Sequence, residues 1–167
     1  MGESQYAKYI RKDMQIKVTS HPHPEVTRPV LILNSDGSFG TANLRLVWMP
    51  ITEPFTMEIK THSHDFDQFL AFVGGDLTNA MDLGGEVEIT LGEEGKELET
   101  FVITTATIVH IPKGLLHCPL VFKKINDPNK PILFQELSLT AEYKRSAEQG
   151  DLTELSEYER FMKNKKS

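Results

Sequence analysis

Residues 61–76 read THSHDFDQFLAFVGGD, and this stretch carries two separate signals. Its first half contains two histidines and a glutamine, His62, His64 and Gln68. Its second half is a short apolar run that ends in a Gly-Gly pair. An apolar run of this length, bounded by turn residues, is typical of a buried β-strand. We therefore expect a strand here, with polar side chains of an unusual kind at its start.

Further apolar runs of similar length lie on both sides of this stretch, and turn signals rich in Gly, Asp, Asn or Pro separate them. In chain order the runs are residues 30–33, 44–49, 55–60, 86–91, 99–111, 118–122 and 132–139. Many short strands joined by such turns indicate a β-sandwich or a β-barrel. No helical period separates the runs, so a βαβ fold is not expected. The sequence predicts an all-β domain.

The two ends of the chain differ from this middle part. Residues 1–29 are expected to form an N-terminal arm with one short helix near residues 5–11, because residues 20–29 contain three prolines. Residues 141–167 are expected to form a C-terminal helical tail. The side chains that recur there at helical spacing are Leu152, Leu155, Tyr158, Phe161 and Met162. Residues 30–140 then form a single barrel domain.

Composition excludes several classes of partner. The chain has 167 residues, of which 39% are hydrophobic and 25% charged, as in one globular domain. Its net charge of −6 argues against nucleic acid as a partner. No apolar run approaches the roughly 20 residues that a membrane span needs, so no membrane partner is expected. The N-terminus lacks a signal-peptide core and Cys118 is the single cysteine, which favours a cytoplasmic location.

The histidines have the spacing of metal ligands. His62 and His64 lie two residues apart, so in a strand they share one face, about 6.5–7 Å apart along the backbone. Gln68 has the same parity, and a buried amide needs a partner. His117 follows a Pro-Gly turn and opens a new strand. We expect His62, His64 and His117 to bind one divalent metal, with Gln68 either as a fourth ligand or as a partner of bound water. The alternative is a metal-free site with vestigial histidines.

The parity of this strand raises one difficulty. Glu58 and Lys60 share the parity of His62, so simple alternation would place two charges on the inward face. A bulge or loop near Thr61 would remove the conflict.

Other residues with reactive side chains have simpler interpretations. His21 and His23 lie between prolines in a loop, where solvent exposure is expected. His110, within the apolar run TIVHI, is interpreted as a core or surface histidine. Cys118 follows a ligand candidate, but strand parity turns it away from the ion, so we expect a buried, inert thiol.

Two motifs resemble those of the cupin superfamily. The segment His62-x-His64-x3-Gln68-x6-Gly75 resembles the first cupin motif, and Pro112-x-Gly114-x2-His117 resembles the second. The resemblance covers roughly residues 40–140. There are four departures from the family pattern. Gln68 replaces a Glu, Thr56 and Ala106 replace the glycines that open the motifs, and Val121 replaces a final Asn.

The resemblance implies a single double-stranded β-helix, or jelly-roll, barrel that holds Fe, Zn, Ni or Mn. It implies a small-molecule substrate, metal-dependent chemistry of the dioxygenase, isomerase or lyase type, and a homodimer. Without the usual carboxylate ligand the site would keep its full +2 charge, which favours an anionic or carbonyl-containing substrate. The alternative is a non-catalytic module that binds a small molecule or a metal. The expected pocket residues are Trp48, Phe55, Met57, Leu70 and Phe72, with Glu136 as a candidate general base.

Overall fold

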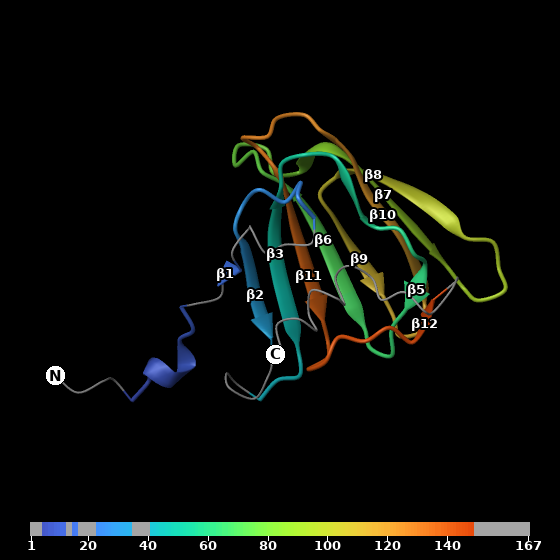
Figure 1. Ribbon diagram of the computed structural model, residues 1–167. Helices are drawn as coiled ribbons and strands as arrows, with labels where there is room; N and C mark the ends of the chain where they lie inside the picture. Colours follow the sequence, from blue (N-terminus) through green and yellow to red (C-terminus); the bar gives the residue numbers. More distant parts are fainter. Residues whose placement is uncertain (1–4, 13–14, 17–22, 35–40, 149–167) are drawn as a thin grey trace.

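The computed structural model describes residues 5–12, 15–16, 23–34 and 41–148, and they form an all-β fold of two antiparallel sheets that face each other (Figure 1). The first sheet consists, in spatial order, of β1 (Gln15–Ile16), β2 (Val30–Asn34), β3 (Arg45–Ile51), β11 (Ile132–Ser138), β6 (Gln68–Gly74) and β9 (Thr107–Ile111). The second consists of β12 (Ala147–Glu148), β5 (His62–Ser63), β10 (Leu116–Ile125), β7 (Asp82–Gly92) and β8 (Glu99–Thr105), with β4 (Phe55–Glu58) paired to β10.

Strand register arranges the inward side chains of the first sheet in layers. Residues paired across antiparallel strands lie on the same face. Ser138 of β11 pairs with Arg45 of β3 on one side and with Gln68 of β6 on the other. The next inward residue of β11, Glu136, lies between Val47 and Leu70. A polar layer therefore lies at one end of the sheet.

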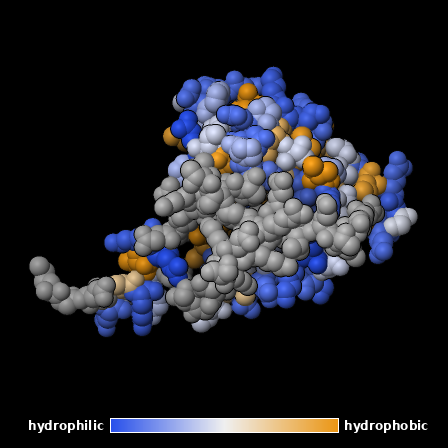
Figure 2. All heavy atoms as spheres, in the orientation of Figure 1, coloured by the Kyte–Doolittle hydropathy of each residue, from blue (hydrophilic) through white to orange (hydrophobic). Residues whose placement is uncertain are grey.

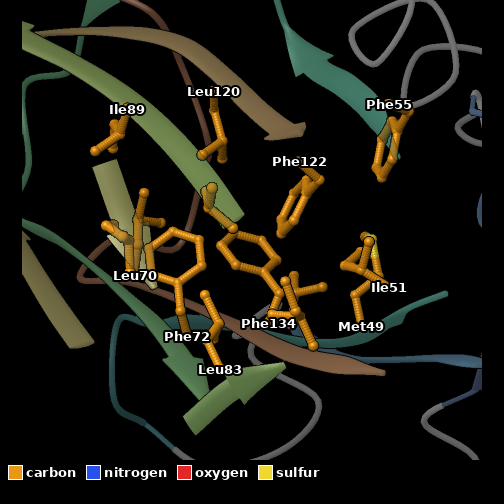
Figure 3. Packing of buried hydrophobic residues seen from close by; sticks show 14 of the residues in the cluster. Met49, Ile51, Phe55, Leu70, Phe72, Leu83, Ile89, Leu120, Phe122 and Phe134 are labelled. Atoms are coloured by element: carbon orange, nitrogen blue, oxygen red, sulfur yellow. The ribbon is translucent and has the colours of Figure 1, made fainter. Parts of the chain in front are cut away.

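Aromatic and aliphatic side chains fill the interior below that layer. Phe72 and Phe122 have no exposed surface, and the Phe134 ring lies 5.3 Å from the first and 5.7 Å from the second, centroid to centroid. Figure 3 shows these rings pointing toward one another between the two sheets, with Leu83 and Ile89 beside them. Burying such side chains is the main source of stability in a domain of this kind, and most of that apolar core lies below the polar layer.

Near the ends of the chain, only some of the sequence predictions can be compared with the structure. The helix near residues 5–11 is a single 3-10 turn, η1 (Ala7–Tyr9), which buries no residue. The helix expected at residues 152–162 lies outside the described residues. No helix in the described part of the chain is long and apolar enough to cross a bilayer. Figure 2 shows a coloured surface that is largely hydrophilic, with apolar residues in separate spots.

Candidate metal centre and pocket

The structure brings His62, His64 and His117 together. His62 belongs to β5, His64 follows that strand directly, and His117 of β10 is the register partner of His62. The ring centroids of His62 and His117 lie 4.3 Å apart, and the His64 centroid lies 4.9 Å from each of the others. All three side chains are buried. Three imidazoles from two distant parts of the sequence therefore form one cluster inside the barrel.

The turn before β10 joins the two halves of this cluster. Leu115 N–H donates to the Pro112 carbonyl at 3.1 Å, and Gly114 N–H donates to the backbone carbonyl of His64 at 2.9 Å. Gly114 has φ 84, a backbone conformation that residues with a Cβ rarely adopt. The Pro-Gly signal of the sequence thus ties the turn before His117 to the backbone of His64.

Backbone carbonyls fix the tautomer of each ring. The Nδ1 atoms lie 2.9 Å from the Lys60 carbonyl for His62, 2.6 Å from the Lys144 carbonyl for His64 and 3.1 Å from the Leu115 carbonyl for His117. A carbonyl oxygen only accepts, so each Nδ1 carries the proton and each Nε2 keeps its lone pair. Nε2 of His62 and Nε2 of His64 are buried and have no hydrogen-bond partner among the described residues.

Burial keeps these rings neutral. Desolvation, followed by repulsion from His117, lowers the pKa of His62 from 6.5 to about 2. Desolvation also lowers the pKa of His64, and it lowers the pKa of His117 to about 4. Neutral imidazoles with free Nε2 atoms are the form that binds a transition metal. The ligand atoms of His62 and His117, together with that of Cys118, lie within 4.8 Å of one another, which fits such an ion, and His64 is not part of that group.

The same pKa shifts predict that the metal-free protein loses stability in acid. The unfolded chain takes up protons on these histidines below about pH 6.5, whereas the folded chain does not until the pH is much lower. For His62 and His117, acid therefore favours the unfolded state between about pH 6.5 and pH 4, by about 1.4 kcal/mol per pH unit each, and His64 acts in the same direction. Urea unfolding of metal-free protein at pH 8, 6 and 5 measures how the free energy of unfolding changes with pH. His110→Asn is the control, and it is expected to show the same change with pH as the wild type. A free energy of unfolding that does not change from pH 8 to pH 5 would contradict the prediction.

Gln68 and Cys118 are the two candidates for a fourth ligand. Gln68 is buried, lines the pocket beside the histidines and donates its Nε2–H to Ser138 Oγ at 3.2 Å. The ligand atoms of Cys118, His62 and His117 lie within 4.8 Å of one another. The prediction that strand parity turns Cys118 away is wrong, because the register of β10 shifts after His117 and Cys118 has φ 77. Burial raises the pKa of its thiol.

A cavity of about 90 Å³ lies inside the barrel next to this cluster. By this measure one water occupies roughly 10–15 Å³, so the cavity has the size of a small molecule. Apolar side chains form most of its wall, and they are Val30, Ile32, Val47, Met49, Met57, Leu70, Leu120 and Phe134. Its polar wall consists of His62, Gln68, His117 and Cys118 together with His23, Arg45, Glu58, Glu136, Tyr143 and Arg145.

Three of the expected pocket residues line this cavity and three do not. Met57, Leu70 and Glu136 are part of its wall. Trp48 lies on the outer face of β3, where it is 37% exposed, because Val47 and Met49 take the inward positions. Phe55 and Phe72 belong to the buried core. Phe72 is one layer below Leu70 on β6, and Phe55 stacks on Phe122 at 5.4 Å.

Two ion pairs inside the pocket were missed by the sequence analysis. Arg45 pairs with Glu136, and Arg145 pairs with Glu58. The second pair explains how Glu58 can face inward, as its parity with His62 predicted. The positive charge of Arg145 compensates its negative charge. Arg45 could have been found, because it shares the inward parity of Val47 in β3 and a charge in such a row needs a partner.

A segment after β11 forms one wall of the centre, and no signal in the sequence indicated it. We call residues 143–148 the strap. Tyr143 packs its ring on His64 at 4.7 Å, and Lys144 supplies the carbonyl that orients His64. Ser146 N–H donates to the Ser63 carbonyl at 2.8 Å, and β12 then pairs with β5. Burial raises the pKa of the Tyr143 hydroxyl, which keeps it protonated.

The remaining histidines have different surroundings. His23 lines the pocket, and its ring lies 5.1 Å from that of Phe55, so the expectation of a solvent-exposed loop histidine is wrong for this residue. The aromatic contact holds it against the barrel in spite of the flanking prolines. His110 is a surface histidine, with Nε2 3.2 Å from Asp67 Oδ2. His21 lies outside the described residues.

Comparisons with known proteins give a likeness of fold. No protein-family model matches the sequence, and no curated protein matches it. A solved structure of Bacillus subtilis oxalate decarboxylase, from work on its Mn(II) centres, has a TM-score of 0.49 and 15% identity over 71% of this chain and 27% of that chain. A structure on the substrate binding mode of oxalate decarboxylase has a TM-score of 0.49 and 16% identity over the same shares, 71% and 27%.

A third oxalate decarboxylase structure, on proton-coupled electron transfer, has a TM-score of 0.49 and 13% identity over 81% of this chain and 31% of that chain. The chain thus spans about a third or less of the length of these enzymes. The described strands form two antiparallel sheets, as the resemblance to the two cupin motifs implies.

Proposed function

We propose that this protein binds one divalent transition metal through Nε2 of His62, His64 and His117, and that its pocket admits a small molecule to that metal. The observation that carries the proposal is the set of three Nδ1 contacts to backbone carbonyls. Metal-binding histidines are commonly held in this way, with the second ring nitrogen donating to a fixed oxygen. A histidine cluster kept only for packing would not need Nε2 of His62 and Nε2 of His64 to be buried without a hydrogen-bond partner.

The charges around the pocket favour an anionic or carbonyl-containing ligand. Arg45 and Arg145 are each neutralised by a glutamate, and the histidines are neutral. None of the four candidate ligands, His62, His64, His117 and Gln68, carries a negative charge. A bound divalent ion would therefore keep its full charge. Such an ion is a strong Lewis acid that polarises a ligand oxygen. The expected reaction class is that of an isomerase, lyase or dioxygenase.

Glu136 is the best placed of the pocket residues to accept a proton. Its side chain lines the cavity between Val47 and Leu70, and it accepts hydrogen bonds from Arg45 and from Ser138 at 3.0 Å. A general base must lie within hydrogen-bond reach of the proton that it removes. Because the cavity is small and Glu136 lines it, a ligand bound there would lie within that reach.

Elemental analysis of protein purified without a histidine tag tests the metal proposal. We expect close to one equivalent of a divalent transition metal per chain. Less than about a tenth of an equivalent, after reconstitution with Fe, Zn, Ni and Mn, would favour a vestigial site. An oxygen-uptake and product screen with the loaded protein separates an enzyme from the second candidate, a non-catalytic binding module, because only an enzyme turns over.

Replacing Gln68 with glutamate is expected to tighten metal binding. The carboxylate adds a negative charge next to the ion, whereas the amide adds none. Competition with a chelator of known affinity measures the change, with Gln135→Glu on the outer face of β11 as the matched control. An unchanged affinity would place the side chain of residue 68 outside the coordination sphere. Without metal, the variant is expected to be less stable than the wild type, because a buried charge then lacks a partner.

A further inference from the structure

We infer that Ser138 is a positioning residue that, together with Glu136 and Arg45, orients the Gln68 amide so that its oxygen faces the ion. The inference rests on the proposed function and deepens it. Gln68 Nε2–H donates to Ser138 Oγ at 3.2 Å, and Ser138 Oγ–H donates to Glu136 Oε1 at 3.0 Å. Arg45 Nη1 contacts that same Oε1 atom. The four side chains form one continuous hydrogen-bonded row.

The direction of this row follows from the chemistry of its end groups. An arginine side chain only donates hydrogen bonds, and an ionised carboxylate only accepts them. Glu136 must therefore receive the single hydroxyl proton of Ser138. Once that proton is used, Ser138 Oγ can only accept from its other neighbour. The neighbour is the Gln68 amide, which must present its NH2 group to Ser138.

The opposite orientation of the amide would break the row. If Gln68 turned its oxygen toward Ser138, that oxygen and the Glu136 carboxylate would compete for one hydroxyl proton. If the proton stayed with Glu136, the Gln68 oxygen would be a buried acceptor without a donor, which protein interiors avoid. If the proton turned to Gln68, Glu136 would keep only Arg45 as its donor, and the Ser138 oxygen, 3.0 Å away, would face it with a lone pair and no proton. Ser138 has no exposed surface and does not line the cavity, so solvent does not replace its hydroxyl as the shared partner of Gln68 and Glu136. The row therefore keeps Oε1, the only metal-binding atom of the amide, on the side away from Ser138.

This arrangement also explains the departure from the cupin motif at residue 68. A glutamate there would have no N–H to offer to Ser138 and would add a second carboxylate beside Glu136. Glutamine is the residue of the same shape that supplies both a donor for Ser138 and an acceptor for an ion. Ser138 thus acts on the metal through Gln68, in the way that outer partners orient ligands.

Measurements of Co2+ affinity and visible absorption on four proteins test the inference. The proteins are the wild type, Ser138→Ala, Gln68→Ala and the double variant. We expect Ser138→Ala to weaken Co2+ binding about 10-fold and to change the absorption spectrum, because Gln68 then loses its orientation. We expect the same substitution to have no effect when residue 68 is already alanine. Thr52→Ala, which removes another buried hydroxyl that contacts Thr27 and does not line the cavity, is the matched control and should bind Co2+ like the wild type.

Three outcomes would overturn the inference. Wild-type affinity and spectrum in Ser138→Ala would show that the row does not orient Gln68. If Ser138→Ala weakens Co2+ binding equally with and without the Gln68 side chain, Ser138 acts through the stability of the fold. Thermal unfolding of the metal-free variants would then show that both proteins with Ser138→Ala are equally destabilised. A wild-type protein that binds no Co2+ at all would instead overturn the proposed function, and with it this inference.

Discussion

His117→Ala is expected to abolish stable metal binding, with a loss of affinity greater than about 100-fold. Removing an outer partner of a ligand costs about 10–100-fold, and removing the ligand itself should cost more. Each of the three rings contacts both others, and the His117 centroid lies 4.3 Å from that of His62 and 4.9 Å from that of His64. Elemental analysis after dialysis, together with chelator competition, measures the loss. His64→Ala is expected to behave in the same way.

The control for this prediction is His110→Ala. His110 lies on the exposed face of β9 and pairs with Asp67, so its removal should leave the metal content unchanged. The barrel of His117→Ala should remain folded, because the core around Phe72 and Phe122 lies below the polar layer. Circular dichroism and thermal unfolding check this. Full metal content in folded His117→Ala protein would refute the ligand assignment.

The histidine cluster could be predicted from sequence because it depends on local patterns. The i, i+2 spacing predicts that His62 and His64 share one face, and the Pro-Gly signal predicts a turn before His117. That the two halves meet was predicted from the resemblance to the two cupin motifs. Short apolar runs between turn residues were likewise sufficient for the all-β class. These features are fixed within a few residues of chain.

Strand parity was less reliable where both faces of a strand are apolar. The run around Trp48 is apolar on its inward and outward sides, so nothing in the sequence indicated which set faces the core. The structure places Val47 and Met49 inward and Trp48 outward. The prediction for Cys118 was wrong for a different reason. Its backbone conformation and the register shift of β10 interrupt the alternation of side chains that the prediction assumed.

The strap could not be predicted because every contact that defines it is long-range. Lys144 orients His64 across 80 residues of sequence, and Arg145 pairs with Glu58 across 87. The segment has no apolar period of its own that would mark it as a strand or a helix. Its position depends on charges and carbonyls that come together only when the barrel has closed.

Arg145→Met is the second substitution with a large expected effect, about 3–5 kcal/mol in the free energy of unfolding. The Arg145 and Glu58 side chains are only 5% and 17% exposed, so removing the arginine leaves a largely buried carboxylate without its cation. The strap should also lose its anchor, and with it the Lys144 carbonyl that holds His64. Metal affinity is therefore expected to fall about 10–100-fold, as on removal of a partner that orients a ligand.

Urea unfolding of the metal-free protein and chelator competition measure the two effects separately. Lys123→Met is the matched control, because Lys123 pairs with Glu88 at the surface and such pairs contribute about 0–1 kcal/mol. The double variant Glu58→Met/Arg145→Met should regain most of the lost stability, since no buried charge is left unpaired. If Arg145→Met costs no more than Lys123→Met, the ion pair does not hold the strap. If the double variant regains stability but not affinity, the arginine acts on the metal centre through the position of the strap and not through stability alone.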